Sequence, residues 1–329
     1  MNTKHNESKS TASAAGKLML SVGYAVVHGY PTVVTAVDQR IEVSVEKNGV
    51  DVLHIIAPDL GLQSYTKTIN ELGTRQLPKS VSFIEMLYKR FLENHPQDRG
   101  IVVTTKSDFS ASYGFGSSSA VTVAFAKALT NLYNIKLSKQ ELFDLCYQAV
   151  LDVQGVGSGY DLAAAIWGGT LRYVKPAKEV SPIEVDKIPL VICYTGEKAD
   201  TPTLVRLVDS YYKQNPEKIE STFKKIGQIA DGLTVSLAQQ NWPAVGELFK
   251  ESQQAARDLR VSSTRIEQLI SAAESAGSLG ATSSGAAGGD CILALVEENS
   301  RQNVIDSLEK VGGQIIDVKL NAEGVRLEN

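Results

Sequence analysis

The sequence of 329 residues is poor in the side chains from which disulfide frameworks and zinc sites are built. It has three widely spaced cysteines, Cys146, Cys193 and Cys291, and four dispersed histidines, with no C-x-x-C pair and no Cys/His cluster. An odd set of scattered cysteines argues against a disulfide framework and against a zinc site. Free cysteines of this kind are typical of a reducing compartment, so we expect a cytoplasmic protein.

Long basic runs are also absent. The chain has 33 Lys and Arg against 37 Asp and Glu, a formal net charge of −4. Proteins that bind nucleic acid need clustered Lys and Arg to neutralise phosphates. We therefore expect no nucleic-acid partner, although a locally basic pocket for a small anion is compatible with this charge.

No stretch approaches the ~20 uninterrupted apolar residues that cross a membrane. The apolar segment KLMLSVGYAVVHGYP is broken by Gly23, His28 and Pro31 and lacks a clear cleavage site, so neither a signal peptide nor a membrane partner is expected. The first residues are polar, and we expect a disordered tail over residues 1–14.

The residues that are present have globular composition, 43% hydrophobic and 21% charged. The first third is rich in β-branched residues, and Asn48-Gly49 between two strand-like runs predicts a hairpin. Residues 120–133 predict a central buried helix, and Ser138 and Glu141 form a capping-box pair at the start of another helix. The Pro- and charge-rich stretch 175–189 favours a domain boundary. We therefore predict two α+β domains, over 15–186 and 187–329.

Three loops of small residues interrupt this pattern. In the first, YGFGSSSA, Gly114 and Gly116 precede serines at the start of the predicted buried helix. Unpaired N–H groups and the helix dipole favour a phosphate there, and a serine hydroxyl can complete a Mg²⁺ shell. The structural alternative is a serine N-cap after a turn. The loop is not a Walker A motif, because no Lys follows its glycines.

The second loop, QGVGSGYD, ends at Asp161. Its carboxylate could accept a proton from a substrate hydroxyl. The alternative is a capping box, because Ser158 and Asp161 have Ser-x-x-Asp spacing. The Gly-x-Gly-x-Gly spacing after a helix is not a dinucleotide fingerprint.

The third loop, residues 281–291, has the sequence ATSSGAAGGDC. Such small residues allow the backbone to approach a ligand closely, and the alternative is an interdomain turn. Lys17 stands at the start of an apolar strand. The structural alternative for it is a lysine whose aliphatic stem packs on the strand while its ammonium reaches solvent. Beside a carboxylate and a phosphate Lys17 would supply the charge that phosphoryl transfer requires.

Taken in order, the segments GKLMLSVGYAVVHGYP, YGFGSSSAVTVAFAKAL and SSGAAGGDC resemble the three motifs of the GHMP kinases, which include galactokinase, homoserine kinase, mevalonate kinase and phosphomevalonate kinase. The resemblance runs from about residue 15 to 321, and QGVGSGYDLAAAIWGG and YTGEKADTPTLV also look like the family. The isoprenoid-precursor branch fits best. The second and third motifs are most similar to phosphomevalonate kinases, whereas TGEKADT and AVVHG suit mevalonate kinases equally.

The resemblance implies a two-domain α+β fold, with an N-terminal domain like ribosomal protein S5 domain 2 and a ferredoxin-like C-terminal domain. It implies an ATP-dependent phosphotransferase that uses Mg²⁺, with Lys17 stabilising developing charge and Asp161 as base. The residues it implies for ATP are Gly114, Gly116, Ser117, Ser118, Ser119, Ser284, Gly285 and Gly288. Those for the acceptor are Ser158, Gly159 and Ala287, and Ser118 would also hold the metal.

We therefore expect phosphorylation of phosphomevalonate to diphosphomevalonate, with mevalonate as the alternative acceptor. An alternative of another class is a catalytically silent protein that binds nucleotide or metabolite. The partners expected are ATP and this small molecule, and a homodimer is compatible with the resemblance.

The sequence departs from the family at three positions. Val22-Gly23 stands where the first motif normally carries Gly-Glu. Val150 stands about eleven residues before Asp161, where mevalonate kinases carry a magnesium-binding Glu, and nearby Asp152 should face elsewhere on its helix. Ser112 stands where phosphomevalonate kinases can carry a Lys. Metal coordination and the choice of acceptor depend on these positions.

Overall fold

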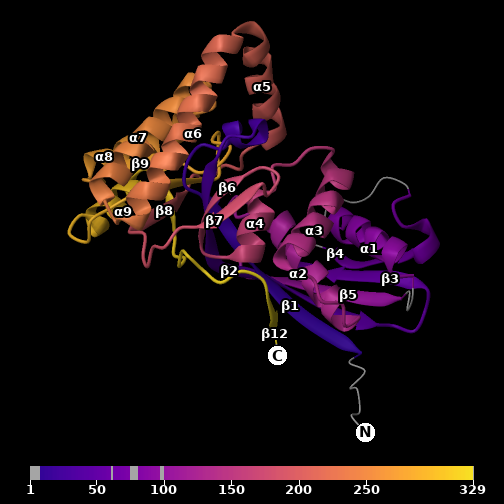
Figure 1. The fold of residues 1–329 in the computed structure, drawn as a ribbon. Helices are drawn as coiled ribbons and strands as arrows, with labels where there is room; N and C mark the ends of the chain where they lie inside the picture. The colour runs from indigo at the N-terminus through magenta and orange to yellow at the C-terminus, as the bar shows by residue number, and fades with distance from the viewer. Residues whose placement is uncertain (1–7, 61, 75–80, 97–99, 329) are drawn as a thin grey trace.

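The computed structural model describes residues 8–60, 62–74, 81–96 and 100–328, which form two sheets with helices packed against each (Figure 1). Among these residues, eight strands make the first sheet, in the order β12-β1-β2-β5-β3-β4, with β6 and β7 continuing from β2. Their bounds are β1 Lys9–Met19, β2 Thr32–Lys47, β3 Val52–Ala57, β4 Leu62–Thr68, β5 Ile101–Ser107, β6 Thr170–Val174, β7 Glu179–Pro182 and β12 Arg326–Glu328.

The first strand begins earlier than predicted. Residues 9–14 lie in β1, paired with β2 and β12, so the prediction of a disordered tail over 1–14 is wrong for this part. Most of these side chains are small, and all but Lys9 and the half-buried Thr11 are buried in the sheet. Residues 1–7 lie outside the described residues.

The predicted hairpin is wrong in its turn and in its pairing. Gly49 has a φ of +70°, but Asn48 lacks the positive φ that a type I′ turn requires at both central residues. Strand β5 lies between β2 and β3, pairing antiparallel with β2 and parallel with β3. The main-chain N–H of Asn48 donates to Gly100 O at 3.1 Å, and a Cβ on Gly100 would lie 1.5 Å from Val50 O. Strand β5 thus occupies the place beside β2 that β3 would have taken in a hairpin.

Four helices cover the first sheet: α1 Ser82–Asn94, α2 Ser117–Leu132, α3 Lys139–Gln154 and α4 Tyr160–Trp167. Helix α2 packs on β1 and β2 and is buried along most of its length, as its continuous apolar sequence predicts. The capping box at the start of α3 is confirmed: Ser138 accepts from the Glu141 N–H, and the Glu141 carboxylate accepts from the Ser138 N–H.

The second sheet has the order β11-β8-β10-β9, with all its pairs antiparallel. Its strands are β8 Leu190–Tyr194, β9 Gly280–Ser283, β10 Cys291–Leu295 and β11 Gln314–Ile316. Helices α5 Thr201–Gln214, α6 Pro216–Ala238, α7 Trp242–Asp258 and α8 Thr264–Ser275 connect β8 to β9, and α9 Arg301–Lys310 connects β10 to β11. This β-α-β-β-α-β order confirms the predicted ferredoxin-like domain. Figure 1 shows these helices gathered at one end of the molecule.

The end of the chain returns to the first domain, so the prediction that residues 187–329 form one domain is wrong for the last strand. Strand β12 pairs with β1, and the buried Arg40 guanidinium donates to Glu323 O at 2.8 Å and to Gly324 O at 2.7 Å. These contacts are too distant in sequence for a local pattern to show. The boundary near residue 186 stays a prediction. No helix in the described parts of the chain combines the length and apolar character needed to cross a bilayer.

Candidate active site

The first loop leads directly into α2. Gly114 and Gly116 both have φ +75°, and Gly116 is the N-cap residue in the left-handed conformation. In the part of the chain that the structure describes, no side chain caps this helix, so the serine N-cap alternative is wrong. Ser117 and Ser118 are half-buried and Ser119 is buried. The start of α2 therefore keeps the open N-terminus that an anion would use.

Lys17 lies on β1, directly behind this loop. Its main-chain N–H donates to Phe115 O at 2.9 Å, and its Nζ donates to Gly114 O at 2.8 Å. The side chain is buried and its Nζ lies 5.3 Å from the ring centroid of Tyr160, so Lys17 is not a rim lysine. Burial alone would lower the pKa of Lys17, but Tyr160, Asp161 and Asp290 raise it, and the net direction is upward. The ammonium is therefore held protonated beside the loop.

Asp161 lies in the first turn of α4, but it does not cap the helix. The N-cap is Gly159, without a side-chain hydrogen bond, and Asp161 Oδ1 accepts only from the adjacent Leu162 N–H at 3.1 Å among the described contacts. The capping-box alternative for Ser158 and Asp161 is therefore wrong. Two buried hydroxyls fix the loop before it: Tyr173 donates to Ser158 O at 2.7 Å and Tyr147 to Gly157 O at 2.9 Å.

Lys17 and Asp161 meet at Gly116. A Cβ built on Gly116 would lie 3.1 Å from Lys17 Cε and 3.6 Å from Asp161 Cβ. A cation and a carboxylate, on β1 and α4, thus flank the N-terminus of a third element, α2. The sequence predicted both residues, and the structure brings them together.

The third loop packs on the first motif. Ser284 Oγ accepts from Met19 N at 3.2 Å and donates to Met19 O at 2.9 Å, while Gly23 N donates to Gly285 O at 2.7 Å. Because the Ser284 hydroxyl is already engaged, the structure does not support it as an ATP ligand. Ala287 is fully buried, so the structure does not support its predicted contact with the acceptor either. The roles of Gly285, Gly288, Ser158 and Gly159 stay predictions.

The three departures from the family have structural consequences. A Cβ on Gly23 would lie 2.6 Å from Met19 Sδ, so a Glu at this position would have to displace the Met19 side chain. Val150 is buried. Asp152 faces away from the site, as expected, and its Oδ1 accepts from Arg90 Nη2 at 2.6 Å. The Ser112 hydroxyl pairs with that of Ser110 at 2.7 Å.

The donors present fit Mg²⁺ bound mainly through its substrate. Across the described residues, no group of three or more His, Cys, Asp or Glu could hold a metal. Magnesium keeps several waters and binds phosphates with few protein ligands. The half-buried Ser118 hydroxyl, in the first turn of α2, is the protein ligand that suits such an ion.

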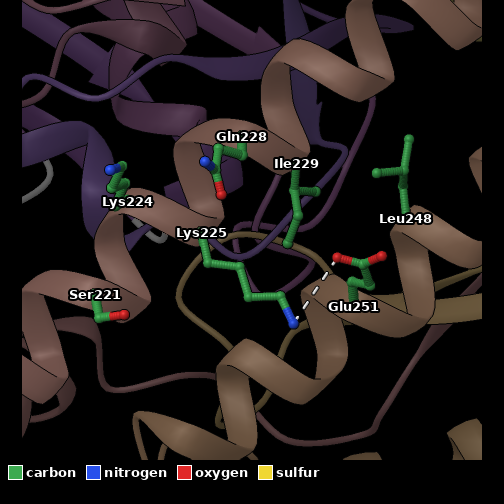
Figure 2. A pocket seen from close by; sticks show the side chains of 7 residues that line it. All are labelled: Ser221, Lys224, Lys225, Gln228, Ile229, Leu248 and Glu251. Carbon is green, nitrogen blue, oxygen red and sulfur yellow. Dashed lines mark ion pairs between the residues drawn. The ribbon is translucent and has the colours of Figure 1, made fainter.

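A pocket of about 420 Å³ lies elsewhere, between α6 and α7 (Figure 2). Its lining includes Lys225 and Glu251, which form an ion pair at 3.8 Å, and none of its lining residues belongs to the three loops. It is therefore separate from the site formed by Lys17 and Asp161.

Comparison with known proteins agrees with this geometry. Models of the GHMP kinases N terminal domain and the GHMP kinases C terminal domain match residues 82–169 and 233–314. The mevalonate kinase of Pyrococcus abyssi is 30% identical over 328 residues, covering 96% of this chain and 97% of that protein. The chain belongs to the GHMP kinases. Within them it falls in the mevalonate-pathway branch, and it is an ATP-dependent phosphotransferase.

Solved structures show the same fold in other GHMP kinases and their relatives. The Lin0012 protein of Listeria innocua superposes with a TM-score of 0.85 at 20% identity, covering 98% of this chain and 99% of that chain. Streptococcus pneumoniae phosphomevalonate kinase, in complex with phosphomevalonate and AMPPNP, gives a TM-score of 0.77 at 19% identity, covering 94% and 99%. These structures confirm the predicted two-domain fold.

Proposed function

We propose that this GHMP kinase transfers the γ-phosphoryl group of ATP to the hydroxyl of mevalonate, giving 5-phosphomevalonate. The observation that carries the proposal is the meeting of Lys17 and Asp161 at Gly116, beside the open N-terminus of α2. The relatives named mevalonate kinase match nearly the whole chain, which supports this acceptor over the phosphomevalonate expected from the sequence.

The start of α2 would bind the phosphates. The left-handed Gly116 turns the chain so that the first N–H groups of the helix face the loop, where the dipole favours an anion. Lys17, already hydrogen-bonded to Gly114 O, would add positive charge where the transferred group gains negative charge. Mg²⁺, when bound, would neutralise phosphate charge, with the Ser118 hydroxyl as its protein ligand.

Asp161 would act on the acceptor. In the transfer, the bond from the acceptor oxygen to the γ-phosphorus forms while the bond from that phosphorus to the β,γ-bridging oxygen breaks. The hydroxyl proton passes to the Asp161 carboxylate, whose place next to Gly116 suits a base that faces the phosphoryl group. Most of the acceleration comes from orientation and charge stabilisation.

Phosphomevalonate is the second candidate acceptor, because the sequences of the second and third motifs resemble those of phosphomevalonate kinases. An acceptor phosphate is already anionic, so it needs cations for binding more than it needs a base. Lys17 Nζ donates to Gly114 O in the first loop, and Lys198 Nζ donates to Ala111 O, two residues before that loop. The Asp161 carboxylate beside Lys17 suits an alcohol acceptor, which must give up a proton.

The test is ³¹P NMR of the purified protein with MgATP and, separately, mevalonate, phosphomevalonate, homoserine and galactose. The proposal expects a new phosphomonoester signal with mevalonate. A diphosphate signal with phosphomevalonate alone would overturn the choice of acceptor. ATP binding in calorimetry without any product would instead favour the catalytically silent alternative.

A further inference from the structure

Asp290, in the third loop, joins two segments of the second domain. Its Oδ1 accepts from the Ala199 main-chain N–H at 3.0 Å. Its own N–H donates to Glu197 O at 2.7 Å, and its carbonyl accepts from the Thr195 N–H at 2.9 Å. These three bonds make residues 195–199 and Asp290 a single unit.

That unit contacts residues 111–116, here called the phosphate loop, at two points. The Asp290 carboxylate fills the space over Gly114, because a Cβ built on Gly114 would lie 2.7 Å from Oδ2 and 2.8 Å from Cγ. Lys198 Nζ donates to Ala111 O at 3.0 Å. The second domain therefore holds the loop that the first domain presents to ATP.

The charges of this region alternate in sign. Lys17 interacts electrostatically with Asp161 and with Asp290, and Asp290 interacts with Lys17 and with Lys198. The series Asp161, Lys17, Asp290, Lys198 thus runs from the first domain into the second. A carboxylate beside a phosphate site opposes anion binding, so its presence needs a compensating role.

The backbone conformation by itself offers a simpler reason why an aspartate occupies position 290. Its φ is +57°, and Asp is among the few residues that adopt this region without glycine. That explanation accounts for the main chain, but not for a carboxylate directed across the domain boundary onto Gly114.

We propose that Asp290 is a positioning residue, whose carboxylate holds the Lys17 ammonium at Gly114 and ties the phosphate loop to residues 195–199. The proposal rests on the proposed phosphoryl transfer by Lys17 and Asp161. With the Asp290 charge removed, Lys17 would have Asp161 as its remaining carboxylate partner and would shift toward it, away from the transferred phosphoryl group.

Two substitutions separate the effect of the Asp290 charge from the effect of its side-chain packing. Asp290→Asn keeps an oxygen that can accept from Ala199 N–H and removes the charge. Asp290→Gly removes the whole side chain at a φ that glycine adopts freely, so both variants are expected to fold with melting temperatures near that of the wild type. Asp200→Asn is the matched control: Asp200 accepts from Thr203 N–H at the start of α5, and Asn caps a helix equally well.

Steady-state kinetics with ATP and the acceptor gives the first readout. For Asp290→Asn we expect kcat to fall about tenfold, which corresponds to 1.36 kcal/mol of transition-state stabilisation. KM for ATP should not rise, because the variant removes a negative charge beside the phosphates. Asp290→Gly should lower kcat and also raise KM for ATP, since the loop loses its packing. Wild-type kcat in Asp290→Asn, at an unchanged melting temperature, would overturn the proposal.

The second readout does not depend on turnover. In protein labelled with ¹⁵N-lysine, the ammonium resonance of Lys17 is identified by its loss in Lys17→Met. We expect this resonance to shift or broaden in Asp290→Asn and to be unchanged in Asp200→Asn. An unchanged resonance in Asp290→Asn would overturn the proposal. Absence of turnover by the wild type would refute the proposed function instead, and this measurement would still decide the role of Asp290.

Discussion

The hydroxyl of Tyr173 donates a hydrogen bond of 2.7 Å to the carbonyl of Ser158, three residues before Asp161. Tyr173 is fully buried on β6, and its oxygen also accepts from the Ala177 N–H at 3.1 Å. A side chain of the first sheet therefore holds the loop that precedes Asp161, the candidate base. The position of Asp161 thus depends on a buried side chain of another element.

Tyr173→Phe should consequently affect both stability and turnover. Removing the hydroxyl leaves the half-buried Ser158 carbonyl and Ala177 N–H without this partner, at a cost of about 1 kcal/mol. Turnover should fall because the loop before Asp161 loses a constraint. Denaturant unfolding and kcat measure the two effects. Tyr147→Phe, which removes the bond to Gly157 O farther from Asp161, should lower kcat less; equal kcat losses would contradict the positional argument.

Asp161→Asn should abolish most activity without unfolding the protein. Proton transfer by a positioned side chain contributes about 10²–10⁴-fold, so kcat should fall within this range. The melting temperature should stay near the wild-type value, because Asp161 does not cap α4. Thermal melts and product formation with the acceptor are the measurements. A lower melting temperature with near-normal kcat would restore the capping interpretation.

Gly116→Ala should weaken ATP binding, and Gly155→Ala provides a matched control. Both glycines have a left-handed φ, +75° and +72°, so alanine brings similar backbone strain to each. A Cβ at Gly116 would contact Lys17 Cε at 3.1 Å, whereas one at Gly155 meets nothing within 4 Å. Calorimetry should show reduced ATP affinity for Gly116→Ala and unchanged affinity for Gly155→Ala. Equal affinities in the two variants would exclude Gly116 from the phosphate site.

The protonated Lys17 should stabilise the folded protein up to alkaline pH and should lose this effect only above the ordinary pKa of a lysine. Because its pKa in the folded protein is raised above the ordinary 10.5, this contribution is complete below pH 10.5 and is lost as the pH rises through the folded value. Lys17→Met should remove that alkaline loss of stability while leaving its slope near neutrality unchanged. Urea unfolding at a series of pH values, compared between the two proteins, is the test. An alkaline slope identical in both would show that Lys17 does not titrate as proposed.

Local patterns predicted much of this protein. The continuous apolar run of α2, the capping box of α3 and the small-residue loops all depend on neighbours within a few residues, and the sequence shows these directly. The two residues proposed for chemistry, Lys17 and Asp161, were also predicted. Tyr160 and Asp290 were not, although both belong to segments that resemble family motifs. Their only sequence signal was a bulky or charged side chain next to glycine.

Tertiary structure alone decided the relationships between distant segments. Asn48-Gly49 predicted a hairpin, yet β5 separates its two strands, and Gly100 lies against the backbone of Val50. Residues 9–14, a mixture of polar residues and alanines, form a strand through pairing with β2 and β12. Likewise, only the folded chain shows that Gly159 rather than Ser158 is the N-cap of α4, and that Asp161 lies beside Gly116 and Lys17. Sequence determined which groups were available, while long-range packing determined which of them met.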